Sequence, residues 1–583
     1  MKKFIVALLA LCLVQAEVEA VPNPLRGETW CVLLPVSGCT DPVEHKLVFS
    51  LRTDLFREEK ISYVAIGSII MGKAQPPLRR RFVGINVESH EWPEESKIWP
   101  HLGLLYVGTV AKQADYDVKL WDELIQGKAP LESLVQEGDI VGLSLVTTGI
   151  ERGVELARRC KALGARYVVA GNDSAAFRSR QLLSLPGAPI DAVFTSNSLI
   201  SLRRFFREIP RVEMSRLAIP HVAVKVANAP WLTNEPSGVK LWAKKFGPAD
   251  FFLIPDLSLF GDEYWEKVWS AYRSQFGHKH PEGKNVRNAV ALLAQGCGRA
   301  AAGTVCNECT ILHVGNVAFP KLSYIERTLE TYRAFGINTF FNVTDSAYEM
   351  TPLLRQLQAA GKVDSLVMYG RAEAIASDPK RLDEWLGVVN DRLLINCGME
   401  SADERILQLG INKSDKPGSR VDENHKAIRI IRDAGEKAHL HYSLIFGAVG
   451  EDKDSCKRNL DFVERSIDEL GEGQLDVCES DIFWLNFGAP SAVVFHDYSE
   501  ASKYAQLAGK TISVKQWERN FARFADELVV PQSCAENWYH FFTNISYEAA
   551  LVYNKQVKKL MEKVPGAVTG RDFAHRNPPS ASR

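Results

Sequence analysis

The chain has 583 residues, of which 46% are hydrophobic and 24% charged, proportions that are ordinary for a globular protein. Lysine and arginine number 70 and aspartate and glutamate 71, so no charge bias indicates a nucleic-acid partner, and we expect none. The length predicts roughly two to four domains with buried cores. The 11 cysteines are too few and too irregularly spaced for a disulfide scaffold, which indicates a reducing compartment.

Residues 1–20, MKKFIVALLALCLVQAEVEA, have the features of a secretory signal peptide: a basic start, an apolar stretch, and small residues before Val21. The stretch is too short to span a bilayer comfortably. No other segment reaches the roughly 18 uninterrupted apolar residues of a membrane span, so we expect no membrane partner. Residues 21–80 follow as an N-terminal extension with an irregular pattern.

Residues 81–210 alternate short apolar runs with amphipathic stretches. Strands are predicted at RFVGINV, YDVKLWD, DIVGLSLVT, RYVVAGN and DAVFTSN, and helices at ERGVELARRCKALG and SLISLRRFFREI. This pattern is typical of a parallel sheet covered on both faces, so we predict a doubly wound, flavodoxin-like Rossmann domain. Such domains bind ligands beyond the carboxyl ends of their strands. Residues 211–285, rich in Trp, Pro and Phe, are predicted to be a linker.

A second alternation fills residues 286–490. Its apolar strands begin with NAVALLA at 288–294 and are separated by helical stretches such as SYIERTLETYRAFG. The pattern predicts a partial (β/α)6 TIM-like barrel, in which the chemistry belongs at the carboxyl ends of the strands. Residues 491–583 have helical spacing and are predicted to form a helical C-terminal region. The predicted fold class is therefore α/β, with two different parallel sheets.

Three cysteines follow the first barrel strand in QGCGRAAAGTVCNECTIL: Cys297, Cys306 and Cys309. Structural zinc usually takes four ligands in paired knuckles, and the chain has no second CxxC. Thiols that are merely packed in this loop, which is rich in Gly and Ala, are another alternative. Three thiolates that hold an iron-sulfur cluster leave one iron open for an exogenous ligand, and we favour this interpretation.

The barrel half resembles the radical S-adenosylmethionine (SAM) enzymes. In that family three cysteines on the loop after the first strand hold a [4Fe-4S] cluster, the open iron binds SAM, and reductive cleavage gives a 5'-deoxyadenosyl radical. The usual spacing of three residues and then two is eight and then two here, and Glu308 stands where the family usually has an aromatic residue. The resemblance implies that Cys297, Cys306 and Cys309 bind the cluster.

Four further segments carry this resemblance: NVTDSAYE, MYGRAEA, INCGMESADERILQLGINK and SLIFGAVGEDKDS. They are similar to the family's second-, third-, fourth- and fifth-strand motifs, which line the SAM site. By this resemblance the SAM-binding residues are Asp345, Ser346, Arg371, Glu400, Ser401, Gly447 and Gly450. Simpler alternatives remain open, since Ser401 also suits a helix N-cap with Glu404 at the third helical position, and Arg371 suits a surface salt bridge.

The domain at 81–210 resembles the cobalamin-binding domain of the cobalamin-dependent branch of the same family. The similar stretches are HLGLLYVGTVAKQADYDVKLWD and DIVGLSLVTTGIERGVELARRCKALGARYVVAGNDSAAF. The Asp-x-His-x-x-Gly run that gives cobalamin mutases an axial histidine is absent here, as it generally is in the radical branch, and His90 lies outside any such motif. The alternative is that the polar residues after these strands are turn and cap residues of any flavodoxin-like sheet. The resemblance implies cobalamin contacts at Ser144, Thr147, Thr148, Gly171 and Asn172.

Both resemblances together imply three cofactors: a [4Fe-4S] cluster, SAM and cobalamin. The implied function is that of a cobalamin-dependent radical SAM enzyme, and the interpretation we favour is methylation of an unactivated carbon or phosphorus centre through a 5'-deoxyadenosyl radical and methylcobalamin. One alternative is a rearrangement, cyclisation or ring contraction without methyl transfer. Another is a non-catalytic sensor that binds cobalamin or an iron-sulfur cluster. No catalytic side chain is assigned from the sequence.

Such an enzyme needs a small-molecule or peptide substrate and a cytosolic electron donor. Because an open [4Fe-4S] cluster suffers in oxidising compartments, we predict a cytoplasmic protein, in conflict with the signal-like residues 1–20. Three alternatives resolve the conflict: the true start lies downstream of Met1, these residues form an uncleaved hydrophobic helix, or the protein is exported and the metal interpretation is wrong.

Overall fold

The computed structural model describes residues 29–35, 46–52, 80–88, 98–196, 198–217, 219–226, 229–232, 252–301, 305–309, 317–413 and 420–564. The chain divides into two units, residues 1–79 and residues 80–583. In the first unit, β1 (Thr29–Pro35) and β2 (Lys46–Arg52) form an antiparallel pair. The signal-like segment 1–20 and His90 lie outside the described residues.

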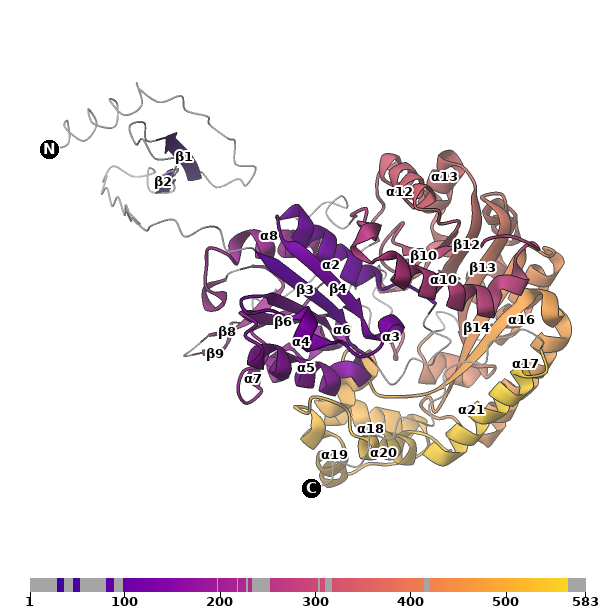
Figure 1. The fold of residues 1–583 in the computed structure, drawn as a ribbon. Helices are drawn as coiled ribbons and strands as arrows, with labels where there is room; N and C mark the ends of the chain where they lie inside the picture. The colour runs from indigo at the N-terminus through magenta and orange to yellow at the C-terminus, as the bar shows by residue number, and fades with distance from the viewer. Residues whose placement is uncertain are drawn as a thin grey trace, which may run out of the picture. The chain divides into compact units, whose positions relative to one another are not determined.

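The second unit contains two sheets, and the first is built largely from the segment predicted to be doubly wound (Figure 1). Its strands run in the order β4-β3-β5-β6-β7-β8-β9 and are parallel as far as β7. The first five strands have the 2-1-3-4-5 order of flavodoxin-like sheets, whose ligand crevice opens at the point where the strand order reverses. The strands are β3 (Arg81–Asn86), β4 (Asp117–Asp122), β5 (Ile140–Ser144), β6 (Tyr167–Gly171), β7 (Ala192–Phe194), β8 (Val222–Val226) and β9 (Ala229–Leu232).

Helices cover both faces of this sheet because alternate residues of each strand point in opposite directions. On β3, Phe82 packs in the same core as α2 and α8, whereas Val83 and Ile85 pack in the core that contains α5. The helices of this part are α2 (Leu102–Gln113), α3 (Glu123–Gln126), α4 (Leu131–Leu134), α5 (Ile150–Ala162), α6 (Asp173–Phe177), α7 (Ser179–Ser184) and α8 (Leu199–Glu208).

The sheet continues past residue 210, into the stretch that the sequence pattern predicted to be a linker. There β8 pairs antiparallel with β7, and β9 pairs antiparallel with β8. The apolar run VAVKV of β8 satisfies the hydrogen bonds of the β7 edge, which explains why this stretch is a strand. The rest of the predicted linker contains α10 (Asp262–Phe276), which packs against β10.

The second sheet has six parallel strands that follow one another in chain order. They are β10 (Asn288–Ala291), β11 (Thr339–Asn342), β12 (Val363–Gly370), β13 (Val389–Glu400), β14 (Ala438–Phe446) and β15 (Leu475–Ile482). Within the described strands no pairing joins β10 to β15, so the sheet is open. The prediction of a mixed α/β fold with parallel sheets is confirmed, and the sequential order is the one expected of a partial barrel.

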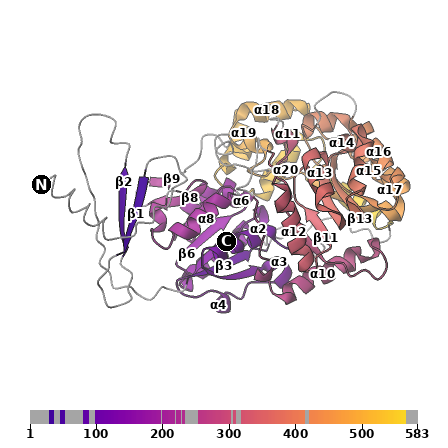
Figure 2. The ribbon, with the colours of Figure 1, turned by 90° about the horizontal axis from the view of Figure 1, so that it is seen from above.

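Helices connect these strands and lie outside the sheet, as Figure 2 shows. They are α12 (Leu322–Ala334), α13 (Thr351–Ala360), α14 (Ala372–Ser377), α15 (Pro379–Leu386), α16 (Arg420–Asp433) and α17 (Lys453–Gln474). The short α11 (Gly298–Ala301) belongs to the loop after β10 that carries the three cysteines.

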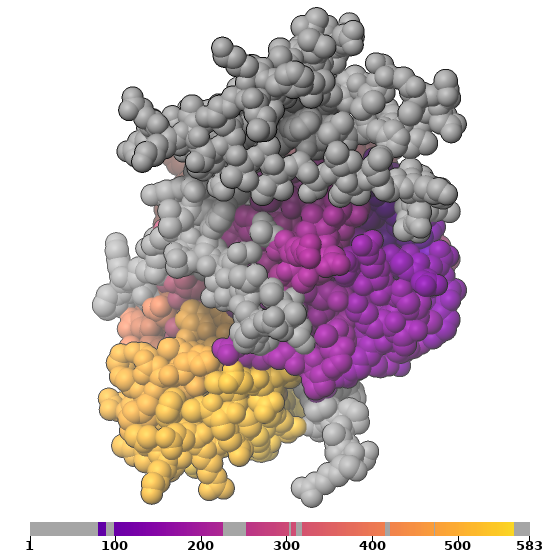
Figure 3. Space-filling view, turned by 90° about the vertical axis from the view of Figure 1, so that its left-hand side faces the viewer, coloured from indigo at the N-terminus to yellow at the C-terminus, as the bar shows by residue number. Residues whose placement is uncertain are grey.

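The C-terminal part is helical and contacts both sheets. Its helices are α18 (Tyr498–Leu507), α19 (Val514–Asn520), α20 (Gln532–Phe542) and α21 (Tyr547–Met561). Helix α21 packs on β15, and Arg178, which lies between α6 and α7, donates a 2.9 Å hydrogen bond to the carbonyl oxygen of Ala525. In Figure 3 the violet surface of the first sheet's part adjoins the yellow surface of the C-terminal part. Among the described residues no helix has the length and apolar character that crossing a membrane requires.

Candidate functional site

One cavity of about 1030 Å³ lies between the carboxyl ends of the first sheet and the interior face of the second. This volume is at the upper end of the range for small-molecule sites, about 300–1,000 Å³. Most of the residues predicted to bind a cluster, SAM or cobalamin line it. They are Ser144, Gly171, Asn172, Cys297, Cys306, Cys309, Asp345, Ser346, Arg371 and Glu400.

All three cysteines of the loop after β10 face this cavity, and each is partly exposed and outside any disulfide. Ser346 donates a 3.5 Å hydrogen bond to Cys297 Sγ, and burial raises the pKa of the Cys306 thiol to about 11. Among the described residues, no three His, Cys, Asp or Glu side chains are arranged to hold a single metal ion. A [4Fe-4S] cluster takes its three thiolates on three different irons, so the sulfurs need not meet at one point. The donor set and the shared cavity therefore fit such a cluster.

The cysteine loop is held in place by the turn at residues 410–413, a contact that the sequence did not reveal. Asn307 donates from its backbone N–H to the carbonyl oxygen of Ile411 (2.9 Å) and from its side chain to that of Gly410 (3.0 Å). Asn412 donates in return to the carbonyl oxygen of Val305 (3.1 Å). The two segments lie about 100 residues apart, so only the folded chain brings them together.

Arg299 adds two more hydrogen bonds to the same turn, to the carbonyl oxygens of Asn412 (2.8 Å) and Lys413 (2.9 Å). Arg299 is 5% exposed, and both Arg299 and Lys413 line the cavity beside Cys306. Positive charge at this place favours the thiolate form that a metal cluster requires.

Glu400 and Lys413 form a buried ion pair at the end of β13. Lys413 Nζ lies 2.7 Å from Glu400 Oε1 and also donates to the carbonyl oxygen of Gly398. Burial alone would lower the pKa of Lys413, but the charge of Glu400 raises it above its ordinary value. Glu400 has a φ of 59°, at a bulge where β13 shifts register against β14, and this turns its side chain back over Gly398. A Cβ at Gly398 would overlap the carboxylate and the ammonium group.

Two acidic groups near the cysteines have raised pKa values. Burial and the neighbouring Glu400 raise the pKa of Glu308 to about 8, and burial raises that of Asp345 to about 6. Arg371 lines the cavity, but its guanidinium is ion-paired with Glu349 and Glu373, at 3.2 Å each. The predicted partner of a SAM carboxylate is thus already held by two protein carboxylates.

Three of the predicted SAM contacts do not line the cavity: Ser401, Gly447 and Gly450. Ser401 is fully buried and accepts a 3.1 Å hydrogen bond from the backbone N–H of Asp403, as a residue at a helix start does. A Cβ at Gly447 would overlap the ring of Tyr539, and one at Gly450 would lie 3.0 Å from Arg405 and 3.3 Å from Leu507. These two glycines therefore allow other parts of the protein, rather than a ligand, to approach the backbone closely.

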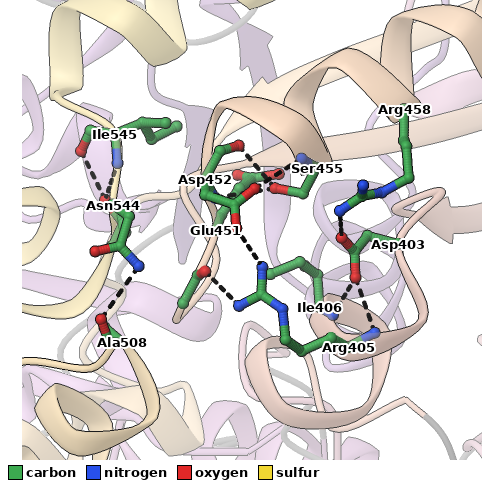
Figure 4. A network of polar contacts seen from close by, with 12 residues as sticks. Asp403, Arg405, Ile406, Glu451, Asp452, Ser455, Arg458, Ala508, Asn544 and Ile545 are labelled. Atoms are coloured by element: carbon green, nitrogen blue, oxygen red, sulfur yellow. Dashed lines mark hydrogen bonds and ion pairs between the residues drawn. The ribbon is translucent and has the colours of Figure 1, made fainter.

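A polar network holds the segment after β14 against the start of the short helix Ile406–Gly410, which follows β13 (Figure 4). Arg405 donates to the carbonyl oxygen of Gly450 (2.6 Å) and to Asp452 Oδ2 (2.8 Å). Asp452 also accepts a 2.8 Å bond from the backbone N–H of Ser455, which caps α17. Asp403 accepts from the backbone N–H of Arg405 (2.9 Å) and is ion-paired with Arg458. The ion pairs Arg405–Asp452 and Asp403–Arg458 therefore link the sequence motif around residue 401 to the motif around residue 447.

Glu451 lies within this segment and is fully buried, with one carboxylate oxygen accepting from the backbone N–H of Gly447. Burial, and then the negative charge of Asp403, raise the pKa of Glu451 from its ordinary value of 4.5 to about 8. The folded protein therefore binds this proton more tightly than the unfolded chain. The stabilising contribution is complete below pH 4.5 and is lost as the pH rises through 8.

We therefore expect Glu451→Gln, which imitates the protonated acid, to match the wild type near pH 5. At pH 9 the variant should be more stable, by about 2–4 kcal/mol, because only the wild type then carries a buried charge. Urea denaturation at several pH values between 5 and 9 measures this difference. Parallel stability profiles for the two proteins would contradict the prediction.

On the side of the first sheet, Ser144 lies at the centre of a small polar cluster. His101 Nδ1 accepts a 2.9 Å bond from the backbone N–H of Leu104, so the ring hydrogen lies on Nε2, 3.1 Å from Ser144 Oγ. Asn172, whose φ is 81°, donates a second 3.1 Å bond to the same oxygen. Burial lowers the pKa of His101 and keeps the ring neutral. With both acceptor positions used, the hydroxyl hydrogen of Ser144 is available to an acceptor in the cavity.

The other two predicted cobalamin contacts lie away from the large cavity. Thr147 Oγ1 is 2.8 Å from Ser174 Oγ and lines a separate cavity of about 190 Å³ with Asn486 and Phe487, whereas Thr148 lines neither. His101 and Lys413 are cavity residues that sequence reasoning missed. His101 directly precedes α2, a capping position that the sequence makes recognisable, whereas no local sequence pattern marks Lys413.

The fold is similar to that of two solved structures of TsrM from Kitasatospora setae, a radical S-adenosylmethionine methyltransferase. One contains cobalamin and a [4Fe-4S] cluster, and the other contains tryptophan substrate and the SAM analogue aza-SAM. Each is 14% identical in sequence, and the match covers 73% of this chain and 76% of TsrM, with TM-scores of 0.52 and 0.53. At this identity the likeness is one of fold. No protein-family model matches the chain, and no curated protein matches it in sequence.

Proposed function

We propose that this protein is a cobalamin-dependent radical SAM enzyme that methylates an unactivated carbon or phosphorus centre. The observation that carries the proposal is one shared cavity of about 1030 Å³. In it, three cysteines from the loop after β10 face the carboxyl ends of a sheet with the strand order of flavodoxin. The similarity in fold to TsrM, which contains both cofactors, supports it. Methylation is preferred to rearrangement because TsrM is a methyltransferase.

In this proposal Cys297, Cys306 and Cys309 hold the [4Fe-4S] cluster. Asp345, Ser346 and Glu400 lie beside the cysteines in the cavity and bind SAM. The cofactors supply one-electron chemistry and a transferable methyl group, while the chain positions them and excludes water. The turn at 410–413 fixes the cysteine loop.

The cobalamin side is proposed to consist of Ser144, Gly171 and Asn172. Their polar groups end β5 and β6, where doubly wound sheets bind ligands, and the Ser144 hydroxyl can donate to a corrin amide. A small-molecule or peptide substrate and a low-potential electron donor complete the proposed partners, and the cytoplasm is the proposed compartment.

The test is anaerobic reconstitution with iron, sulfide and hydroxocobalamin, followed by dithionite and SAM. The wild type should bind about four irons and one cobalamin and form S-adenosylhomocysteine. The variant with Cys297, Cys306 and Cys309 replaced by Ala should bind almost no iron and form no product, because the cluster has lost its thiolate ligands. Cys160→Ala, at a buried cysteine in α5 outside the cavity, is the matched control and should behave as the wild type.

The products separate the alternatives. S-adenosylhomocysteine supports methyl transfer, and 5'-deoxyadenosine without it supports the non-methylating enzyme. Cofactor loading without either product supports the sensor. A wild type that retains neither iron nor cobalamin would contradict all three.

A further inference from the structure

The separate cavity of about 190 Å³ lies where the first sheet's part meets the loop after β15 and the C-terminal part. Its walls come from the segments after β5 and β6, from the loop after β15, and from the stretch before α20. The function proposed above assigns no ligand to it. The polar residues that line this cavity are Thr147, Asn172, Asp173, Ser174, Arg178 and Asn486.

Arg178 brings a positive charge to this cavity and is only 4% exposed. Its Nη1 donates the hydrogen bond to the carbonyl oxygen of Ala525 described above. The other two nitrogens, Nε and Nη2, are buried and have no hydrogen-bond partner among the described residues. Such a group is costly, because a buried charge normally regains in the protein the hydrogen bonds that it made in water. The cavity therefore lacks an acceptor at this place.

The two unused nitrogens lie on the same edge of the guanidinium. A planar guanidinium presents Nε–H and Nη2–H side by side, which is the arrangement that binds two oxygens of one carboxylate or phosphate. The Cζ atom lies over the ring of Phe487, and this stacking keeps the N–H groups in the plane of the guanidinium. The bond to Ala525 fixes the orientation of the group. The edge is therefore arranged in advance for an oxyanion.

Neutral hydrogen-bonding groups line the same cavity. Thr147 Oγ1 lies 2.8 Å from Ser174 Oγ and 3.5 Å from Asn486 Oδ1. The hydroxyl and amide groups of these side chains can donate to a ligand in addition to the arginine edge. A phosphate group, with up to four oxygens, can use more donors than a carboxylate with two, so this set of donors favours phosphate.

The protein's own carboxylates do not complete the site. Burial lowers the pKa of Arg178 to about 9, and the charges of the exposed Asp526 and Glu527 offset only part of this effect. Asp173 lines the cavity, and burial, followed by the charge of Asp345, raises its pKa to about 6. Asp173 does not bond to Nε or Nη2 of Arg178. A bound anion would therefore supply the counter-charge that this edge of the guanidinium lacks.

We propose that this cavity binds a phosphate group, held by the Nε–Nη2 edge of Arg178 together with the side chains of Ser174 and Asn486. The site goes beyond the function proposed above and does not depend on it. Two sources can provide the group: a free phosphate or phosphorylated small molecule, and the phosphodiester in the nucleotide of cobalamin. The second is included because Asn172 lines both this cavity and the large one.

Equilibrium dialysis of the full-length protein against radiolabelled inorganic phosphate tests the proposal, in chloride buffer of constant ionic strength. We expect one saturable site in the wild type, and a Kd weakened about tenfold or more by Arg178→Met, because charged bidentate hydrogen bonds are the strong ones. Arg178→Lys keeps the charge but loses the fork, and should weaken binding about threefold to tenfold. Arg180→Met, at an exposed residue of α7 outside the cavity, is the matched control and should keep the Kd of the wild type.

Two further measurements separate binding from a purely structural role of Arg178. Asp173→Asn should tighten phosphate binding about threefold to tenfold, because it removes a negative charge from the same cavity. Phosphate should raise the urea midpoint of the wild type and leave that of Arg178→Met unchanged, because a ligand stabilises only the protein that binds it. If Arg178→Met does not fold, Arg178→Lys and Asp173→Asn still carry the test.

Cobalamin and cobinamide, which lacks the nucleotide and its phosphate, distinguish the two sources. Displacement of the labelled phosphate by cobalamin alone would support the site and assign it to the phosphodiester of the cofactor. Displacement by neither would support a site for free phosphate or a phosphorylated small molecule. Displacement by both would place the phosphate in the large cavity and overturn the proposal. So would the absence of saturable binding in the wild type, or equal Kd values for the wild type and Arg178→Lys.

Discussion

Replacing Lys413 with methionine should lower the free energy of unfolding of the cofactor-free protein by about 3–5 kcal/mol, the usual cost of removing one partner of a buried ion pair. Lys413 and Glu400 each have about a tenth of the side chain exposed, and their charges are 2.7 Å apart. Without the ammonium group, Glu400 is left beside Glu308 and Cys306, with which it already interacts unfavourably. The carbonyl oxygen of Gly398 also loses its donor.

The same substitution should reduce iron binding on reconstitution, because the 410–413 turn that holds the cysteine loop is anchored by Lys413. Urea denaturation and iron analysis are the two measurements. The double variant Lys413→Met, Glu400→Gln removes both charges and should recover much of the lost stability, since the cost lies in the unpaired carboxylate. A single variant as stable as the wild type would show that the pair contributes nothing.

The parts of this protein that sequence could predict are those with a local pattern. Strand and helix periodicity indicated both parallel sheets, since buried parallel strands are short continuous apolar runs. The spacing of Cys297, Cys306 and Cys309 is equally local, and all three do line one cavity. The end of the first sheet was missed because β8 and β9 are short strands in a stretch rich in Pro and aromatic residues.

The parts that could not be predicted depend on contacts between distant segments. The bond from Asn307 to Ile411 joins two turns that have no common motif. The sequence around Gly447 and Gly450 suggested a backbone that approaches a ligand, but Tyr539 and Arg405 occupy the space beside these glycines. Tyr539 belongs to α20, and no local sequence pattern shows where that helix packs.

Replacing Asp476 with asparagine should be the most destabilising single change at the amino-terminal end of the second sheet, by about 3–5 kcal/mol. Asp476 is completely buried at the start of β15, ion-paired with the buried Arg392 and 3.8 Å from Lys279 Nζ. His439 Nδ1 lies 3.0 Å from the same carboxylate, but burial lowers the pKa of His439 to about 2, so it brings no charge. The substitution therefore removes the carboxylate that pairs with the buried guanidinium of Arg392.

The effect should reach the cavity as well as the stability. Arg392 donates a 3.3 Å bond to the hydroxyl of Tyr272, which lines the cavity and whose ring centroid lies 5.3 Å from that of Trp99. An uncompensated Arg392 will move towards solvent or another acceptor, and Tyr272 then loses its hydrogen bond at the cavity wall. The double variant Asp476→Asn, Arg392→Met should recover part of the lost stability. It should not restore the hydrogen bond to the Tyr272 hydroxyl, because Arg392 is its donor. If Asp476→Asn unfolds at the same urea concentration as the wild type, the buried charges are compensated by solvent, and this end of the sheet is more open than its burial indicates.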